Sequence, residues 1–344
     1  MKHYALKRAG MALLAWAVSV LAISTILNAS LEATARADIL ESVRAMVGAS
    51  TEASRGGRSV EDFRADTKMA LERAYGLHLS LPARVLKSWW RIVSLDLGTA
   101  GTAFSGTAAR RTKVLEAFRS TLVLFSLSTA LSVAAGLALA LAAASKPGGR
   151  TDRLLSRVAA MIHGAPTWWA GAFLVMAFSL ELRIFPFGAL ASVPPPENPF
   201  LALLDRLSYL VLPVLSITAL RVWAFALLAR AALDANLHED FVMSARGRGI
   251  PERKIMRSHV LRSSGPAIAS NAVIALVQSF GGDALVEIVF ARPGLGLLLW
   301  TSIRGNDIRL TAGAFAALSL VICVSMALLD LAYGLLDPRV RSSK

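Results

Sequence analysis

The sequence predicts an all-α membrane protein with six transmembrane helices and both termini in the cytoplasm. Its 344 residues are 55% hydrophobic and only 17% charged, whereas soluble domains are nearer a quarter charged. Several apolar runs reach the roughly 20 residues that a helix needs to cross a bilayer. Lys and Arg cluster beside these runs, as they do in cytoplasmic loops. The positive charge therefore indicates membrane topology, and we expect no nucleic-acid partner.

Six apolar runs are the candidate spans. The first two contain no charge, the third contains Pro166, and the fourth contains Arg221. The fifth contains Asp283 and Glu287, and the sixth contains Asp330. In chain order the runs are residues 9–31, 120–144, 158–180, 207–229, 266–290 and 311–336. Lipid offers backbone groups no hydrogen bonds, so each run is expected to be a closed helix.

The distribution of Lys and Arg sets the orientation. With the N-terminus inside, the cytoplasmic segments hold 17 of these residues, and the short outer loops 181–206 and 291–310 hold five. Both termini are therefore expected in the cytoplasm. Ala35-Arg36-Ala37 is similar to a signal-peptide cleavage site. The preceding apolar stretch is longer than the usual 7–15 residues, so we expect an uncleaved first helix.

A polar periplasmic segment, residues 32–119, is expected between the first and second spans. Its pattern predicts a helix over Val60–Tyr75, and Trp89 and Trp90 suit a membrane interface. Two interpretations stay open for this segment: a solvated cap over the bundle, or a docking surface for a partner. The remaining divisions are 1–31 (tail and first helix), 120–336 (five-helix core) and 337–344 (cytoplasmic tail).

Chemistry-bearing motifs are sparse. Cys323 is the single cysteine, which rules out an internal disulfide and a cysteine zinc site. No phosphate-binding G-x-x-x-x-G-K-[ST] loop occurs. No paired carboxylates or nucleophile–base arrangement stands out, and His163 has no second histidine at ligand spacing. We expect no enzymatic activity, no cofactor and no metal site.

The longest cytoplasmic loop, residues 231–265, predicts a short amphipathic helix. Phe241, Val242 and Ala245 can share a face at three- and four-residue spacing. Gly249 suits a helix C-terminus, and Pro251 prevents continuation. Such a helix is well shaped to enter a partner's groove, but an ordinary basic cytoplasmic loop is the open alternative.

This loop resembles the coupling segment, or EAA loop, of binding-protein-dependent importer permeases in the dipeptide/oligopeptide/nickel family. Residues 239–249 follow the family pattern E-D-Y-V-R-T-A-R-A-K-G, and His259-Val260-Leu261-Arg262 follows H-A-L-R. The stretch 286–296 is similar to V-E-x-I-F…P-G-L-G, and 330–341 to D-L-x-Y-x-x-L-D-P-R-V-R. The first helix departs from the family, because it lacks the usual ending P-G-D-P.

The resemblance implies a permease subunit of an ATP-driven (ABC) importer in a bacterial cytoplasmic membrane. Such a subunit forms half of a translocation pathway for peptides or similar small solutes. The implied partners are membrane lipid, a second permease (by preference a paralogue), two cytoplasmic ATP-binding subunits and an external substrate-binding protein. The implied ATPase-coupling residues are Glu239, Asp240, Phe241, Ala245, Arg246, Gly249, Pro251 and His259.

Polar residues inside the spans are costly and are therefore candidates for a translocation pathway. Asp283 and Glu287 lie four residues apart, which places them on one helical face. We hypothesise that Asp283 pairs with Arg221 in one state; structural ion pairs and hydrogen bonds between helices are the alternatives. The candidate pathway residues are Arg221, Asn271, Gln278, Asp283 and Glu287.

Two other functions compete with the importer. A stand-alone secondary transporter would use Arg221, Asp283 and Glu287, although inverted repeats, frequent in that class, are not evident. A membrane-embedded hydrolase would need a nucleophile and a base at one depth, and only His163 and scattered serines are present.

Overall fold

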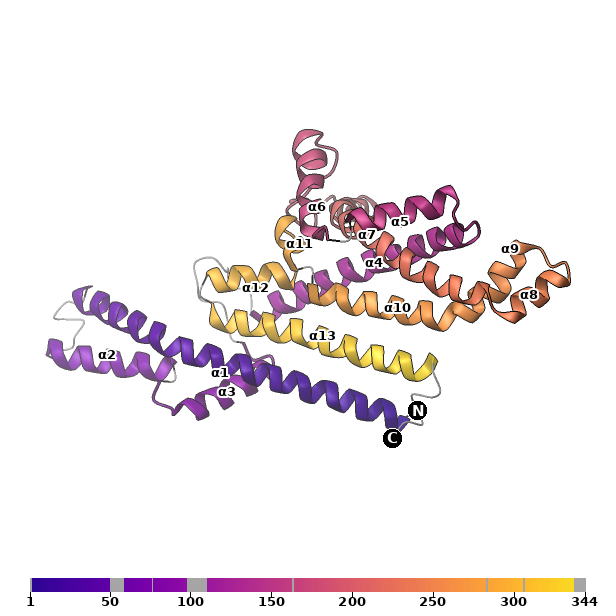
Figure 1. Ribbon diagram of the computed structural model, residues 1–344. Coiled ribbons are helices and arrows are strands. Elements are labelled where there is room, and N and C mark those ends of the chain that lie inside the picture. Colours follow the sequence, from indigo (N-terminus) through magenta and orange to yellow (C-terminus); the bar gives the residue numbers. More distant parts are fainter. Residues whose placement is uncertain are drawn as a thin grey trace.

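All regular structure in the described part of the chain is helical (Figure 1). The computed structural model describes residues 2–49, 59–75, 77–97, 110–162, 164–282, 284–305 and 307–336. The helices are α1 (Lys2–Ala49), α2 (Val60–Tyr75), α3 (Leu81–Val93), α4 (Arg110–Ala144), α5 (Arg150–Ile162), α6 (Thr167–Leu174), the π-helix η1 (Val175–Glu181), α7 (Pro199–Leu237), α8 (Asp240–Gly247), α9 (Glu252–Lys254), the π-helix η2 (Ile255–Val260), α10 (Leu261–Gly282), α11 (Ala284–Val289), α12 (Leu295–Arg304) and α13 (Ile308–Leu336).

The membrane character expected from the sequence is present. Five described helices are long and apolar enough to cross a bilayer: 4–28, 110–144, 199–237, 252–280 and 308–331. A sixth span results if α5 is counted with α6 and η1 as one bent element. The protein is thus a multi-pass helical membrane protein, and the expectation of six spans holds only with that bent pair included.

The third expected span, 158–180, is not one straight helix. α5 ends at Ile162, α6 begins at Thr167, and the two axes differ by 96°. Pro166 is the N-cap of α6. A proline has no N–H to donate and disfavours helical geometry in the residue before it, so Pro166 begins a new helix rather than lying inside one.

Other boundaries also differ from the sequence prediction. α1 continues as one helix to Ala49, well beyond residue 31. The fifth membrane helix begins at Glu252, in the expected loop, and passes through η2 into α10. α10 ends at Gly282, so Glu287 lies on the separate helix α11 and not on the fifth span. The expected outer loop 291–310 contains the apolar helix α12.

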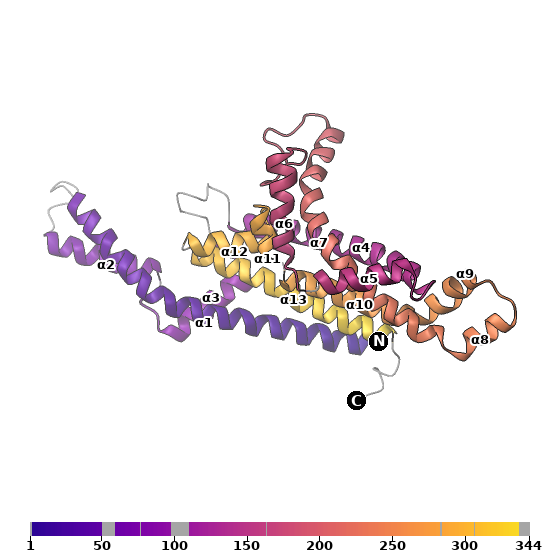
Figure 2. The ribbon, with the colours of Figure 1, turned by 45° about the horizontal axis from the view of Figure 1, so that its top comes forward.

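The centre of the bundle is built on close contact between α4 and α7. A Cβ added at Gly136 of α4 would lie 2.9 Å from the Val222 carbonyl oxygen and from the Phe225 ring of α7. Small residues allow such backbone approach in membrane helices. Around this contact, α10 packs on α4, α7 and α13, and α1 packs along α13 (Figure 2).

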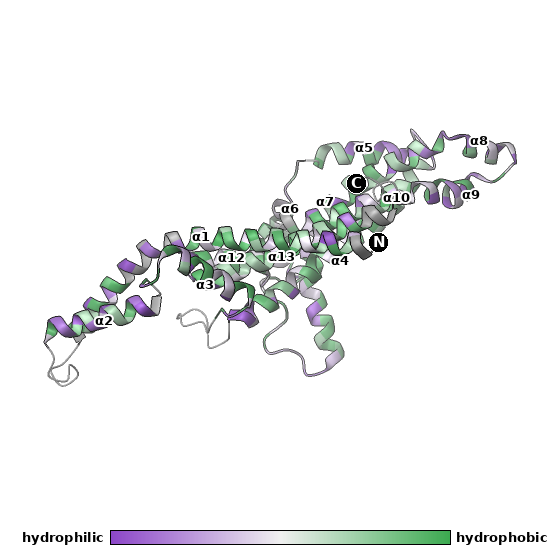
Figure 3. Ribbon diagram, turned by 90° about the horizontal axis from the view of Figure 1, so that it is seen from below, coloured by the Kyte–Doolittle hydropathy of each residue, from purple (hydrophilic) through white to green (hydrophobic). Residues whose placement is uncertain are grey.

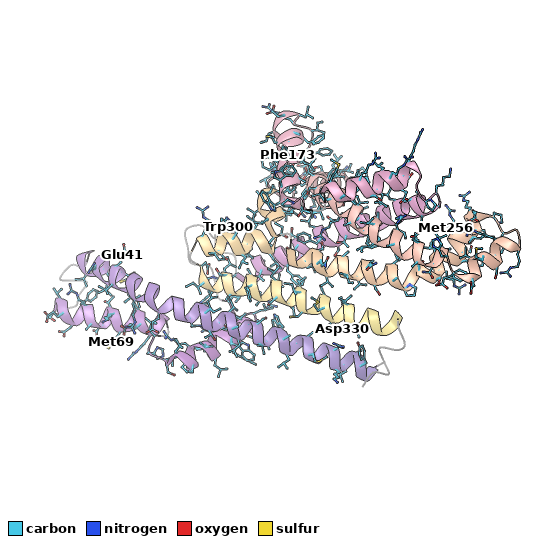
Figure 4. The ribbon with its side chains drawn as sticks, in the orientation of Figure 1. Glu41, Met69, Phe173, Met256, Trp300 and Asp330 are labelled. Carbon is cyan, nitrogen blue, oxygen red and sulfur yellow. The ribbon has the colours of Figure 1, made fainter. Side chains whose placement is uncertain are left out.

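The hydrophilic residues gather toward the two ends of the molecule. Figure 3 shows hydrophobic colours along the middle of α1, α10, α12 and α13, and more hydrophilic colours on α2 and around α8 and α9. Figure 4 places Glu41 and Met69 at one end and Met256 at the other. The α1–α2 hairpin therefore projects from the end opposite to α8 and α9.

Candidate functional site

The short helix α8 ends in a closed hydrogen-bonded cap. Gly249 has φ +73°, a conformation that favours glycine. Its N–H donates to the Arg246 carbonyl oxygen (2.9 Å), and the Ile250 N–H donates to the Ala245 carbonyl oxygen (3.2 Å). These two bonds form a Schellman motif. Pro251 then serves as N-cap of α9, so the expected helix and its stop signals are confirmed.

The underside of α8 is fixed to the bundle by apolar packing. Val242 and Ala245 are 0% and 1% exposed and join a cluster with Leu233 of α7 and Ile255 of η2. Phe241 does not share this buried face, since its exposure is 38%. The buried part of the expected apolar face therefore consists of Val242 and Ala245.

An ion pair closes the turn between α8 and α9. Arg246 donates to both carboxylate oxygens of Glu252, at 2.7 and 3.3 Å. Both side chains are exposed, so the pair adds little stability. Its geometric effect is to hold the start of the fifth membrane helix beside the end of α8.

The structure brings the expected coupling residues together at one end of the bundle. Ala245 faces inward and His259 is half-buried in η2, while the other six are exposed. A hollow of about 610 Å³ lies beside them, lined by the ends of α4 and α7 and by residues of α8, α9 and η2. The exposed coupling residues are Glu239, Asp240, Phe241, Arg246, Gly249 and Pro251.

The candidate pathway residues are distributed over separate environments. Arg221 is half-buried on α7, and Asn271 and Gln278 lie on one face of α10, half-buried and exposed respectively. Asp283 lies outside the described residues, so its hypothesised pairing with Arg221 stays a prediction. His163 is likewise outside them.

Glu287 lies in a buried polar cluster rather than on an open surface. Its side chain is 1% exposed. One carboxylate oxygen accepts from the Thr121 hydroxyl (2.6 Å) and the other from the Gly296 N–H (2.7 Å), while the Leu295 N–H donates to Thr121 Oγ1 (2.8 Å). The carboxylate and hydroxyl thus cap the first turn of α12, where a negative charge is favourable.

This cluster gives the V-E…P-G-L-G pattern a physical reason. A Cβ at Gly294 would overlap the Glu287 carboxylate, and a Cβ at Gly296 would lie 2.6 Å from the Ala284 Cβ. Glycine is therefore needed at both positions for α12 to approach α11. Thr121, whose hydroxyl completes the cluster, carries no sequence signal that singles it out.

A second buried polar cluster joins the N-terminal ends of α4 and α13. Arg110 Nε lies 3.0 Å from both carboxylate oxygens of Asp307, and Arg110 Nη1 donates to the Leu97 carbonyl oxygen. Asp307 also accepts from the Leu310 N–H. Arg110 and Asp307 are each 8% exposed. Arg110 lies among several basic residues of the chain, so no local pattern singles it out as the partner of Asp307.

Two further ion pairs hold the opposite end. Arg8 of α1 pairs with Asp330 of α13 at 2.9 Å, with both side chains about one third exposed. Arg230 of α7 pairs with Asp152 of α5 at 2.7 Å. These pairs connect neighbouring helices. Among the described residues, no group of three or more His, Cys, Asp or Glu side chains could hold a metal ion.

Comparison with known proteins places this chain in a family. Residues 136–342 match the family model for the inner membrane component of binding-protein-dependent transport systems, and the chain belongs to that family. It is similar to the oligopeptide transport system permease protein AppB of Bacillus subtilis, with 25% identity over 80% of this chain and 85% of AppB. It is also similar to a probable peptide ABC transporter permease protein of Sinorhizobium fredii, with 26% identity over 77% of this chain and 82% of that protein.

Proposed function

We propose that this chain is one transmembrane subunit of an ATP-driven importer and that α8 is the element that docks into a cytoplasmic ATPase. The observation that carries the proposal is the construction of α8. The helix has a buried apolar underside, a closed C-terminal cap and exposed outer residues. A short, rigidly held helix at the end of a bundle can transmit movement of a partner to the membrane helices.

The structure around α8 supports such transmission. Its cluster joins α8 to α4, α7, η2 and α10, so displacement of α8 would move four elements together. η2 contains a wide turn, in which the Leu261 N–H donates to the Met256 carbonyl oxygen. Turns of this kind are frequent at functional sites. They offer a point where the fifth membrane helix can bend.

The proposed assembly follows from family membership. It contains a second permease (a paralogue or a second copy), two ATP-binding subunits and an external substrate-binding protein. Both termini and α8 face the cytoplasm of a bacterial cell, because 17 Lys and Arg residues flank the spans on that side. The relatives' names support peptides or similar small solutes as cargo.

Part of the pathway is proposed to follow the open face of α10. Asn271 and Gln278 lie on this face, and a second permease packed beside it would enclose them. Arg221 and Asp283 are proposed to contribute from α7 and from the end of α10. The role of Glu287 is structural, because its two carboxylate oxygens accept hydrogen bonds and its side chain is buried. This burial also weighs against a secondary transporter that would use Glu287.

The test compares two substitutions at Gly249. Arginine disfavours the positive φ of this position, whereas asparagine tolerates it. Apart from its chain neighbours, no described atom lies within 4 Å of a Cβ added there, so both substitutions have room for their Cβ and differ mainly in tolerance of the positive φ. The chain is purified from detergent-solubilised membranes together with its bound subunits.

We expect wild type and Gly249→Asn to retain the ATPase and a second permease, and Gly249→Arg to retain the permease but lose most of the ATPase. Equal unfolding temperatures of the variants show that the membrane bundle is intact. ATP-independent transport by the isolated chain in vesicles, or undiminished ATPase recovery with Gly249→Arg, would contradict the proposal.

A further inference from the structure

Side-chain hydrogen bonds join the last turn of α7 to the first turn of α10. Asn236 Nδ2 donates to Ser264 Oγ at 3.1 Å, and the Ser263 hydroxyl donates to Asn236 Oδ1 at 2.7 Å. Asn236 Nδ2 and the Ser264 hydroxyl also donate to the Ala232 carbonyl oxygen, at 3.0 and 2.9 Å. Both ends of the Asn236 amide are therefore engaged. We call these three side chains and the Ala232 carbonyl group the α7–α10 clamp.

The wide turn of η2 places Ser264 on the buried side of the fifth membrane helix. The buried residues of this side follow at steps of five, four and four positions: Ile255, Val260, Ser264 and Ile268. In a regular α-helix, residues five positions apart point about 140° away from each other. The larger turn of a π-helix brings such residues closer to one face. The η2 turn thus sets the register at which Ser264 meets α7.

Two covalent routes lead from α8 toward the start of α10. One runs along the fifth membrane helix from Glu252 through η2, where the wide turn allows the helix to bend. The other runs back into α7, because only His238 and Glu239 separate α8 from the end of α7. The clamp then joins α7 directly to α10. This second route is shorter and contains no wide turn, so it is the stiffer connection.

The fifth membrane helix is weakened again directly beyond the clamp. Pro266 lies inside α10 and has no N–H to donate to the Arg262 carbonyl oxygen. The short stretch 261–265 therefore lies between two points of weak helical bonding. Apolar packing of Val260 and Ile268 also holds this region, but the hydrophobic effect is not directional. The hydrogen bonds of the clamp are directional, so they fix one position of this stretch relative to α7.

We propose that Asn236 is a positioning residue for transport: through the clamp it makes the start of α10 follow the movement of α7 and α8. This role rests on the proposed function, because it requires an ATPase docked on α8. Ser264 is 1% exposed, and a buried hydroxyl that loses its partners is unfavourable, so the clamp stays closed during the movement. α10 carries Asn271 and Gln278. The clamp therefore links ATPase docking to the proposed pathway.

The test measures helix movement in the purified assembly, reconstituted in nanodiscs. In a Cys323→Ser background, spin labels are attached in pairs. Lys254→Cys on α9, beside the end of α8, or Ala267→Cys on α10 is combined with Ile303→Cys on α12 as the reference. All three label positions are exposed. Double electron–electron resonance gives the distance between the labels before and after addition of Mg²⁺ and a non-hydrolysable ATP analogue.

Wild type should show a nucleotide-dependent shift for both pairs. Asn236→Leu has a similar branched shape but forms no hydrogen bonds. In this variant the shift at position 254 should persist, while the shift at position 267 should fall by about two-fold or more. An unchanged shift at 267, or none in wild type while 254 moves, overturns the role of the clamp and leaves ATPase docking standing. Absence of an ATPase, or of any shift at 254 in wild type, contradicts the proposed function and the clamp with it.

A matched pair of serine variants covers the case in which Asn236→Leu does not assemble. Ser263→Ala and Ser258→Ala remove the same hydroxyl from exposed positions of the fifth membrane helix. Ser263 bonds to Asn236, whereas the Ser258 side chain makes no hydrogen bond within the described residues. Ser263→Ala should reduce the shift at position 267, and Ser258→Ala should not. Equal effects of the two variants overturn the role of the clamp. Adding Ser263→Ala to Asn236→Leu should cause no further loss, since that contact is already removed.

Discussion

At the residue scale, Glu287 shows how burial changes the role of a charged side chain. In an apolar run an acidic residue suggests a pathway for solutes. In the folded chain the carboxylate instead accepts hydrogen bonds from Thr121 and from the first turn of α12. The residue therefore joins three helices, α4, α11 and α12, and it positions the P-G-L-G turn.

Removing this carboxylate should be far more harmful than neutralising it. Glu287→Ala leaves the Gly296 N–H and the Thr121 hydroxyl without their acceptor, at a cost of about 3 kcal/mol. Glu287→Gln keeps one acceptor oxygen and should cost about 1 kcal/mol. Thermal unfolding in detergent measures both, with exposed Glu61→Gln on α2 as the control. Equal losses of stability for Glu287→Ala and Glu287→Gln would refute the capping role.

The burial of the Arg292 guanidinium near this cluster is energetically unfavourable. Its side chain is 5% exposed, and its Nε and Nη1 groups have no hydrogen-bond partner among the residues that the structure describes. Buried unpaired donors are unfavourable. The negative charge of Glu287 acts on this guanidinium, which offsets part of that cost without a direct ion pair.

At the element scale, α8 and α3 are both short amphipathic helices held against longer ones, and they lie toward opposite ends of the molecule. α8 is fixed mainly by an apolar cluster and a C-terminal cap. α3 is fixed by apolar contacts with α1 and α13 and by two polar contacts with α1. The polar contact of Glu32 makes the attachment of α3 sensitive to pH.

Acid should weaken the attachment of α3 to α1. The hydrogen bond from Arg84 holds the pKa of the Glu32 carboxyl below its ordinary value of 4.5. A depressed folded-state pKa adds stability above the ordinary value, and that stability is lost as the pH falls through the folded value.

Unfolding temperatures of wild type and Glu32→Gln should therefore differ at neutral pH and converge once the pH has fallen through the lowered folded-state pKa of Glu32. The control is Glu72→Gln, which removes an acidic group from α2 that forms only a 4.0 Å contact with Lys68. If the difference in unfolding temperature between wild type and Glu32→Gln persists unchanged in acid, the carboxylate charge does not hold α3.

At the scale of the whole molecule, the two ends of the bundle are joined by ion pairs of different burial. Arg110 and Asp307 are buried at the end where α4 and α13 begin. Arg8 and Asp330 are about one third exposed at the other end. Breaking a buried pair leaves an uncompensated charge, whereas an exposed pair contributes little. The end that holds Arg8 and Asp330 should therefore separate more easily than the end that holds Arg110 and Asp307.

Two neutralising substitutions test this difference. Asp307→Asn should destabilise the chain by about 3 kcal/mol, and Asp330→Asn by less than about 1 kcal/mol. Chemical or thermal unfolding gives both values, and hydrogen exchange should be faster near the start of α13 only in the first variant. Similar losses for the two substitutions would show that burial does not distinguish these pairs.

The sequence by itself determined the features that depend on neighbouring residues. Long apolar runs are enough to predict membrane helices. The C-terminus of α8 follows from Gly249 and Pro251, because a helix cap is a local structure. The last span and the helix Val60–Tyr75 were predicted on the same basis and are present.

Only the tertiary structure decided the features that depend on distant residues. Thr121 meets Glu287 across 166 positions of sequence, and Arg110 meets Asp307 across 197. No local pattern records such pairs, because they form when helices pack. The same packing decided that Phe241 stays exposed and that Glu287 lies on the separate helix α11. Burial and partner choice arise from the assembled bundle, since a side chain's surroundings there come from several helices at once.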